Sequence, residues 1–297
     1  MGLMMIPGLS GHEDRVRRDL HSRLDAIGVE SRSDRLGNLV AHFPGDGPRV
    51  MLFTHMDQLG FIVRRIEAGG LISLERLGGV PDRALASQEV LICVGEGRDV
   101  SGIIANKSHH ATTPSEKYKV VPYAELYVDT GLSSASEVEA AGIRIGSPVV
   151  YAPHAVELGN NRICGTSIDD RAGCAVLLEV ARLLKNRTSG PPVDLAFTVL
   201  EEFNLRGALP LAQNLLPDIA IQLDLMLATD TPDMEAHGEM VLGGGPGMSM
   251  YSFHGRGTLN GVIPHPAMVD LFDRAAKAKH IPLQRSAQVG VLTDLSY

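Results

Sequence analysis

The stretch that decides the fold is DLAFTVLEE, residues 194–202, an apolar run that ends in two adjacent glutamates. Its apolar part predicts a buried strand, and the flanking residues 172–184 and 205–214 have the apolar spacing of helices. A further apolar run, residues 219–225, predicts another strand. Because helices alternate with apolar strands, this half of the chain predicts an α/β domain with buried parallel strands.

The amino-terminal part predicts a helix followed by strands. Residues 10–13, Ser-Gly-His-Glu, have the spacing of a capping box, and apolar residues then recur at helical intervals as far as Gly28. Three apolar runs predict strands at residues 38–43, 50–54 and 61–66. The Pro- and Gly-rich residues 44–48 predict a hairpin loop between the first two strands.

The middle of the chain changes in character. From residue 69 to residue 153 it consists of short β-rich pieces divided by glycines, with one short helical stretch at residues 134–141. We interpret residues 69–153 as an inserted β domain. Residues 1–68 and 154–297 then form the α/β domain.

Composition excludes several classes of protein. The 297 residues are 44% hydrophobic and 21% charged, which is typical of a compact globular chain. A net charge of −8 without a basic stripe argues against nucleic-acid and membrane partners, and no run of 18 apolar residues is present. Three cysteines without Cys-x-x-Cys spacing and an amino terminus without a signal-peptide core predict a cytoplasmic protein with reduced thiols.

The polar residues that could carry chemistry share one position, at or just beyond the end of an apolar run. They are His55, Asp57, Asp169, Asp170, Glu201, Glu202 and Asp224. Taken singly, each has an ordinary structural explanation, such as a surface histidine, a helix-capping aspartate or a solvated strand end. Taken together, one histidine and several carboxylates favour a divalent ion such as zinc, cobalt or manganese.

Five of these residues carry more information than the other two. His55 and Asp57 are two residues apart and would face the same side of a strand, so Asp57 could orient a metal-bound imidazole. The neighbouring Glu201 and Glu202 repel one another unless a cation or a proton intervenes. Asp224 lies in a mostly apolar stretch, where a carboxylate without a partner is costly.

Four segments, in the same order, resemble the tetrahedral-aminopeptidase and glutamyl-aminopeptidase family of dinuclear metallopeptidases, some members of which carry an endoglucanase label. These segments are residues 52–62, 167–173, 198–208 and 219–230. The resemblance runs from Ser10 to the last residue. It implies a zinc-exopeptidase-like α/β fold, a mixed sheet flanked by helices, interrupted by a β-rich, barrel-like insertion.

The resemblance also implies roles for the candidate residues. His55, Asp169 and Asp224 would hold one metal ion, and Asp169 would bridge to a second ion that Glu202 also binds. The Asp169–Asp170 peptide bond would be cis. Two further carboxylates would serve the reaction: Glu201 as general base toward a metal-activated water, and Asp57 as the residue that orients His55.

Two departures from the family pattern stand out. Gln58 occupies a position where relatives usually have Glu, which removes a charge that we place near the metals and that could affect substrate preference. The family takes its last metal ligand, a His of the second site, from a segment beyond a Thr-Asp motif, whereas this sequence ends shortly after Thr293-Asp294. We therefore expect that a carboxy-terminal segment is missing and that the second metal site lacks this His. His265 and His280 flank a predicted helix, residues 267–279, and we expect them at the surface.

The leading hypothesis is a metal-dependent aminopeptidase that removes amino-terminal residues from peptides. The alternative is a catalytically impaired scaffold or peptide-binding relative. A glycosidase using Glu201 and Glu202 is disfavoured, because adjacent strand residues point to opposite faces. The resemblance implies a homo-oligomer, a dimer or a dodecamer, and residues 253–257 are a candidate rim of the specificity pocket.

Overall fold

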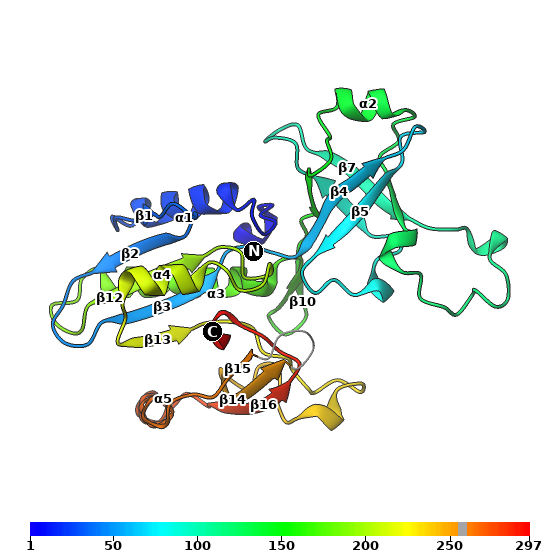
Figure 1. The fold of residues 1–297 in the computed structure, drawn as a ribbon. Coiled ribbons are helices and arrows are strands. Elements are labelled where there is room, and N and C mark those ends of the chain that lie inside the picture. The colour runs from blue at the N-terminus through cyan, green and yellow to red at the C-terminus, as the bar shows by residue number, and fades with distance from the viewer. Residues whose placement is uncertain (255–259) are drawn as a thin grey trace. The chain divides into compact units, whose positions relative to one another are not determined.

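The computed structural model describes residues 1–254 and 260–297. The chain forms two compact units, Met1–Ile221 and Gln222–Tyr297 (Figure 1). Of the candidate pocket rim, residues 255–257 lie outside the described residues.

The first unit is built around a five-stranded mixed sheet. Its strand order is β1 (Arg32–Ser33), β2 (Leu39–Phe43), β12 (Val193–Thr198), β3 (Val50–His55) and β13 (Ile219–Gln222). Strand β12 runs antiparallel to β2 and parallel to β3. At the start of β13, the backbone N–H of Ile219 donates to the carbonyl of Arg49 at 3.1 Å. The α/β class with a mixed sheet is therefore confirmed.

The predicted hairpin at residues 44–48 is wrong. Strands β2 and β3 do not pair, because β12 lies between them. All six residues of β12 are buried, so this strand takes a central place where its apolar side chains are covered on both faces. The loop at residues 44–48 therefore spans the width of an inserted strand.

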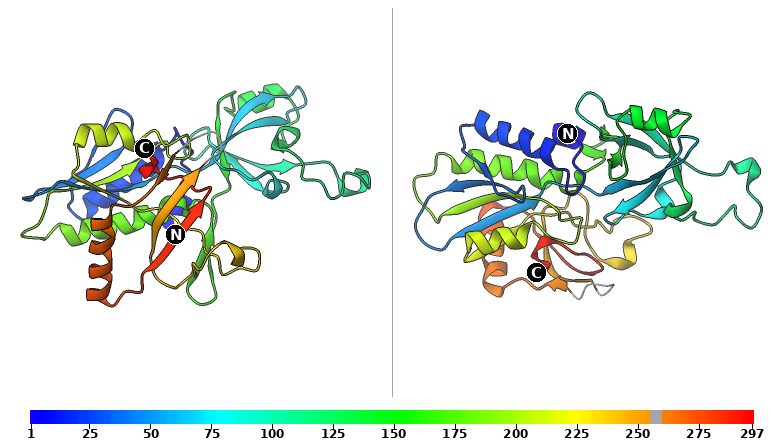
Figure 2. Two further views of the ribbon diagram at one scale, coloured as in Figure 1. Left: turned by 60° about the horizontal axis from the view of Figure 1, so that its bottom comes forward. Right: turned by 45° about the horizontal axis from the view of Figure 1, so that its top comes forward.

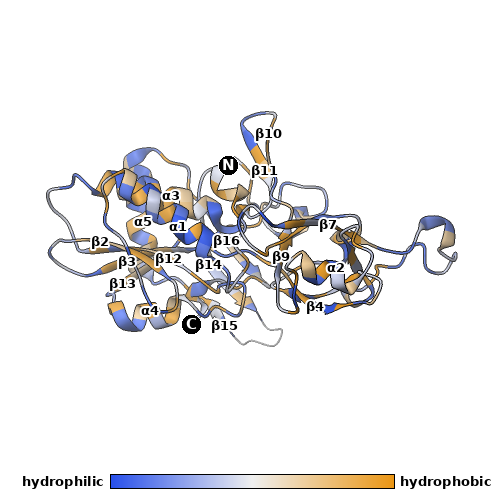
Figure 3. Cartoon of the chain, turned by 90° about the horizontal axis from the view of Figure 1, so that it is seen from above, coloured by the Kyte–Doolittle hydropathy of each residue, from blue (hydrophilic) through white to orange (hydrophobic). Residues whose placement is uncertain are grey.

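Helices cover both faces of this sheet. Helix α3 (Ile168–Leu184) packs on β3 and β12, and α1 (Asp14–Ala26) packs beside α3. Helix α4 (Ala208–Leu215) lies on the opposite face (Figures 2 and 3). The apolar stripe of α1 is buried as its spacing predicts, at Val16, Leu20 and Leu24.

The predicted capping box is not formed. Helix α1 begins at Asp14, and no side chain caps its amino terminus. Glu13 is at the N-cap position, and its carboxylate accepts the backbone N–H of Gly11 at 2.7 Å. The pattern at residues 10–13 therefore predicted the start of the helix correctly, but the predicted capping hydrogen bonds are wrong.

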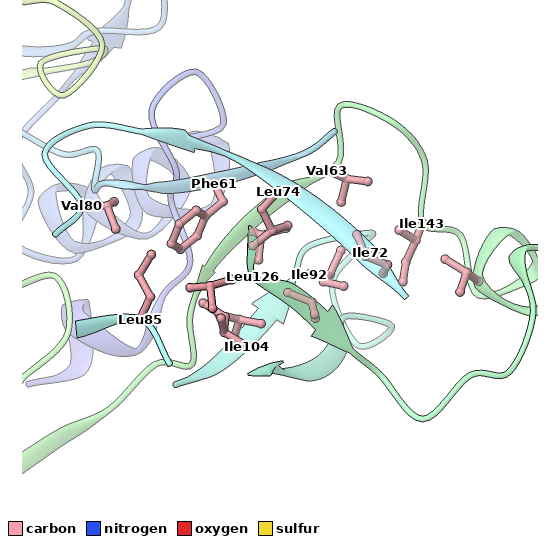
Figure 4. Packing of buried hydrophobic residues seen from close by; sticks show 14 residues of the cluster. Phe61, Val63, Ile72, Leu74, Val80, Leu85, Ile92, Ile104, Leu126 and Ile143 are labelled. Atoms are coloured by element: carbon pink, nitrogen blue, oxygen red, sulfur yellow. The ribbon is translucent and has the colours of Figure 1, made fainter. Parts of the chain in front are cut away.

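The β-rich middle of the chain is a closed six-stranded barrel, in the order β4-β5-β8-β7-β6-β9. Its strands are β4 (Gly60–Ile66), β5 (Ile72–Leu77), β6 (Glu89–Ile92), β7 (Val100–Ala105), β8 (Tyr127–Asp129) and β9 (Pro148–Tyr151). Apolar side chains of these strands point toward one another and fill the interior (Figure 4). The barrel-like insertion is confirmed, and the domain boundaries at residues 69 and 153 stay a prediction.

Several shorter elements complete the first unit. Helix α2 (Ala135–Ala140) lies between β8 and β9 in the chain, and β10 (Ala155–Leu158) pairs with β11 (Arg162–Gly165) as a hairpin. Short 3-10 helices are found at Gly2–Met5, Asp82–Ala84, His109–Ala111 and Tyr123–Glu125.

The described residues of the second unit, 222–254 and 260–297, form a three-stranded sheet and one α-helix. The strand order is β15 (Asn260–Val262), β14 (Gly247–His254) and β16 (Gln284–Val289), with β14 antiparallel to β15 and parallel to β16. Helix α5 (Pro266–Lys279) is tied to β16 by an ion pair in which Arg285 Nη2 lies 2.6 Å from Asp273 Oδ2. The unit also contains 3-10 helices at Glu235–His237 and Asp294–Ser296.

Within the described part of the chain, every helix is too short or too polar to span a bilayer.

The barrel interior provides a stability test with a built-in control. Ile104 and Ile103 are neighbours on β7, but Ile104 is 1% exposed and Ile103 is 51% exposed. We expect Ile104→Ala to lower the free energy of unfolding by about 2–5 kcal/mol, because it leaves a cavity in a closed core. Ile103→Ala should change it by about 0.5 kcal/mol or less. Denaturant unfolding measures both values, and equal losses would contradict the barrel packing.

Candidate metal centre

The buried imidazole of His55 lies between two carboxylates. His55 is the last residue of β3, and Asp57 follows two residues later. The Nε2 atom of His55 lies 3.0 Å from Asp169 Oδ1, and its Nδ1 atom lies 3.4 Å from Asp57 Oδ1. His55 and Asp57 are both almost fully buried. The predicted pairing of His55 with Asp57 thus appears as a direct contact of their side chains.

The electrostatics of His55 and Asp57 reflect this contact. Burial alone would lower the pKa of His55, but the hydrogen bonds to Asp169 and Asp57 raise it well above the ordinary value. Burial alone would raise the pKa of Asp57, and the hydrogen bond and charge of His55 bring it below the ordinary value. The surroundings of the imidazole therefore strongly favour a positive charge at this point.

Asp169 and Asp170 have different surroundings at the start of α3. The peptide bond between them is cis, as the family resemblance implies. The side chain of Asp169 is 52% exposed, whereas Asp170 is buried. Asp170 accepts the backbone N–H of Gly173 at 2.9 Å and the hydroxyl of Thr54. Asp169 therefore contacts His55 while its side chain stays half exposed, whereas Asp170 is held inside the fold.

Asp170 lies close to His55 as well. A ring nitrogen of His55 and a carboxylate oxygen of Asp170 lie within 4.8 Å of each other. Burial raises the pKa of Asp170 to about 6, with the charge of Asp169 adding to the rise and His55 opposing it. A Cβ at Gly173 would lie 2.2 Å from Asp170 Oδ2, so only glycine fits at this position. Gly173 and Thr54 are not among the predicted site residues, because a glycine in a helix and a threonine in a strand carry no chemical signal in a sequence.

The glutamate pair lies beyond the end of β12, in a tight turn rather than in the strand. The strand ends at Thr198, and Leu200 has the positive φ of 58°. The carboxylate of Asp57 accepts the backbone N–H of Glu201 at 3.1 Å and that of Glu202 at 3.0 Å. The expectation that the two glutamates alternate as strand residues therefore does not apply.

Glu202 is crowded by other acidic groups. Burial raises the pKa of Glu202 to about 7, and the charges of Asp169 and Asp57 add to the rise, while His55 opposes it. A Cβ at Gly78 would lie 3.0 Å from Glu202 Oε2. Gly78 follows barrel strand β5, so the barrel forms one wall beside this carboxylate. Gly78 is a site residue that was not predicted, because its neighbour Glu202 lies far from it in the sequence.

Asp224 belongs to the second unit. It lies two residues beyond β13, and its carboxylate accepts the side-chain amide of Gln222 at 3.0 Å and the backbone N–H of Leu225 at 2.7 Å. Its expected role as a ligand alongside His55 stays a prediction.

The side chain of Gln58 contacts the amino-terminal segment, and its predicted effect on the charge near the metals stays a prediction. Gln58 is buried, and its side-chain oxygen accepts the backbone N–H of Gly8 at 3.2 Å and Nη2 of Arg171 at 3.3 Å. The buried guanidinium of Arg171 also donates to the carbonyls of Leu3 and Ile6. Gln58 and Arg171 therefore anchor the amino-terminal segment.

The donor set of the first unit fits a divalent cation. One imidazole and the carboxylates of Asp169, Asp170 and Glu202 lie near one another. The pKa values of Asp170 and Glu202 are raised, mainly by burial and in smaller part by neighbouring carboxylates. A cation would remove the repulsion between these carboxylates, and nitrogen with oxygen donors suits zinc, cobalt or manganese. The residues present thus fit a bound metal ion.

The chain is similar to known proteins over almost its whole length. The model of the M42 glutamyl aminopeptidase family matches residues 37–297. SgcX of Escherichia coli strain K12 is 35% identical over 299 residues, which cover 99% of this chain and 80% of SgcX.

Two solved structures are similar to this chain throughout. Aminopeptidase APDkam598 from the archaeon Desulfurococcus kamchatkensis has a TM-score of 0.91 at 32% identity, covering 99% of this chain and 80% of its own. The TET1 peptidase of Pyrococcus horikoshii, which can assemble into a tetrahedron or a large octahedral shell, has a TM-score of 0.85 at 26% identity, covering 99% and 84%. The chain therefore belongs to the M42 glutamyl aminopeptidase family and is a metal-dependent aminopeptidase.

Proposed function

We propose that this aminopeptidase uses two divalent ions, most simply zinc, with cobalt or manganese as alternatives. His55, Asp169 and Asp224 would hold one ion, and Asp169 with Glu202 would hold the other. The crowding of Asp169 and Glu202 around His55 supports three of these ligands. Asp224 joins the set through the family resemblance alone.

The contacts of Asp57 carry this proposal. One carboxylate faces the ring of His55 and also accepts the N–H groups of Glu201 and Glu202. It thereby fixes the proposed metal-binding imidazole relative to the proposed base. Asp57 itself stays buried and acts by orienting these groups.

The reaction we propose is hydrolysis of the first peptide bond of a peptide. Bound divalent ions would lower the pKa of a water molecule and polarise the scissile carbonyl. Glu201 takes a proton from the attacking water as the C–O bond forms. When the C–N bond breaks, Glu201 returns that proton to the leaving amine, so the base is regenerated in each cycle.

Two broader properties belong to the same proposal. We infer a homo-oligomer, either a dimer or a dodecamer, on the strength of the assembling TET1 relative. We also infer a cytoplasmic location, since Cys93, Cys164 and Cys174 are all free thiols, as is usual in a reducing compartment.

The role of Glu201 predicts the effect of one substitution. Glu201→Gln should lower kcat on aminoacyl-nitroanilides by about 10²- to 10⁴-fold, because the amide cannot take the proton. The zinc content, measured by elemental analysis, should stay unchanged, since Glu201 is not among the proposed ligands. Retention of more than half of the activity would contradict the proposed base. A wild-type protein inactive with all three metals would instead favour the scaffold alternative.

The proposed ligands predict a pH dependence of metal binding. Without metal, the pKa of Glu202 is about 7 and that of His55 lies well above its ordinary value, so both groups hold protons that the ion must displace. The apparent dissociation constant for zinc should therefore rise as pH falls below 7, by up to about tenfold per pH unit for each proton released.

Competition with a chelator at several pH values measures this slope. Glu202→Gln should bind zinc more weakly and with a shallower slope, because one titrating ligand is gone. Identical slopes for the two proteins would exclude Glu202 as a ligand.

The proposed oligomer predicts the mass of the particle in solution. Light scattering coupled to size exclusion should give at least twice the mass of one chain, and a fully monomeric protein would contradict the proposal. Measuring at low and high salt identifies an assembly that depends on surface charges, since these are screened by salt.

A further inference from the structure

The turn that carries Glu201 and Glu202 is held in an unusual way. Its four consecutive backbone N–H groups, from residue 199 to residue 202, all donate to side chains rather than to other backbone groups. The bonds are Val199 N to Asn38 Oδ1 at 3.0 Å, Leu200 N to Glu13 Oε1 at 3.1 Å, Glu201 N to Asp57 Oδ1 at 3.1 Å and Glu202 N to Asp57 Oδ2 at 3.0 Å. Three side chains from three separate segments therefore set the path of this turn.

Glu13 has a special place among these three acceptors. It lies at the amino terminus of α1, is 5% exposed, and uses the same oxygen to accept the N–H of Gly11 at 2.7 Å. A carboxylate buried to this degree is costly unless its hydrogen bonds are satisfied. The two hydrogen bonds from backbone N–H groups offset part of that cost, although burial and the charge of Asp57 still raise the pKa of Glu13 to about 7.

The residue that Glu13 holds has a conformation that is unfavourable by itself. Leu200 has φ 58°, in the left-handed region that a branched apolar residue rarely adopts. Such a conformation persists only when its surroundings enforce it. Leu200 directly precedes Glu201, so a change in its backbone angles would move the carboxylate of Glu201 away from its place.

We propose that Glu13 is a positioning residue for catalysis, which holds Leu200 in its left-handed conformation and thereby fixes Glu201 at the site. This inference rests on the proposed role of Glu201 as the base. Glu13 acts through the placement of its carboxylate oxygen beside Leu200 N. Its contribution is to the orientation of Glu201 and not to the binding of the substrate.

Two substitutions separate placement from charge. Glu13→Gln keeps the length of the side chain and an oxygen acceptor but removes the charge. Glu13→Asp keeps the charge but is one methylene shorter, so its oxygen falls short of Leu200 N. We expect Glu13→Asp to lower kcat by about 10- to 100-fold with KM unchanged, because small displacements of a reacting group have effects of this size. Glu13→Gln should stay within about threefold of the wild-type kcat, since it can still accept both hydrogen bonds.

Asp194 provides the matched control. It is a buried carboxylate on β12, the same strand that leads into the turn, and it pairs with His42 and Arg49 away from the glutamates. Asp194→Ala should lower stability without lowering kcat of the folded protein. The proposal would be overturned if Glu13→Asp had the same kcat as Asp194→Ala. It would also be overturned if Glu13→Gln lost as much kcat as Glu13→Asp.

Hydrogen exchange tests the positioning independently of activity. The amides of residues 199–202 should exchange faster in Glu13→Asp than in the wild type or in Asp194→Ala, and unchanged protection would overturn the proposal. If the proposed base were wrong instead, Glu201→Gln would keep its kcat while these amides still responded to Glu13→Asp. The failure of one proposal is therefore distinguishable from the failure of the other.

Discussion

The carboxylate of Asp57 is shielded from water, so every lone pair that solvent would satisfy must be satisfied by the protein. Two successive backbone N–H groups, those of Glu201 and Glu202, donate to it, and the ring of His55 faces it at 3.4 Å. These partners come from β3 and from the turn after β12, two parallel neighbours whose carboxyl ends meet at one edge of the sheet. This buried charge therefore links the ends of two neighbouring strands to the site. Open α/β sheets commonly bind their ligands at this edge.

The parts of the fold that depend on local pattern could be predicted from the sequence. Helix α1 has an apolar stripe, β12 is a continuous apolar run, and the barrel strands are separated by glycines. Each of these patterns can be recognised within a short stretch of sequence. The candidate residues were found for a related reason. His55 and the glutamate pair end buried runs, and polar side chains at such places are conspicuous in a sequence.

The parts that depend on distant residues could not be predicted in this way. Nothing within residues 38–55 shows that β12 separates β2 from β3, because that pairing involves a strand from much later in the chain. Glu13 has the spacing of a capping residue, yet its carboxylate binds Leu200, which the local pattern does not contain. The partners of the Gln58 side chain, Gly8 and Arg171, lie far from it along the chain and have no signal near residue 58. In each case a contact between segments far apart in sequence decided the outcome.

The position of β12 also imposes an order on folding during synthesis. The barrel strands, from Gly60 to Tyr151, form a contiguous stretch, so the barrel can close as soon as that stretch has left the ribosome. Strands β2 and β3 are made earlier, but they have no shared neighbour until Val193–Thr198 emerges. Their unpaired backbone groups remain available to other chains through that interval. Strands β2 and β3 are thus made before the barrel but completed after it, so the nascent chain still has unpaired strand edges when its barrel has already closed.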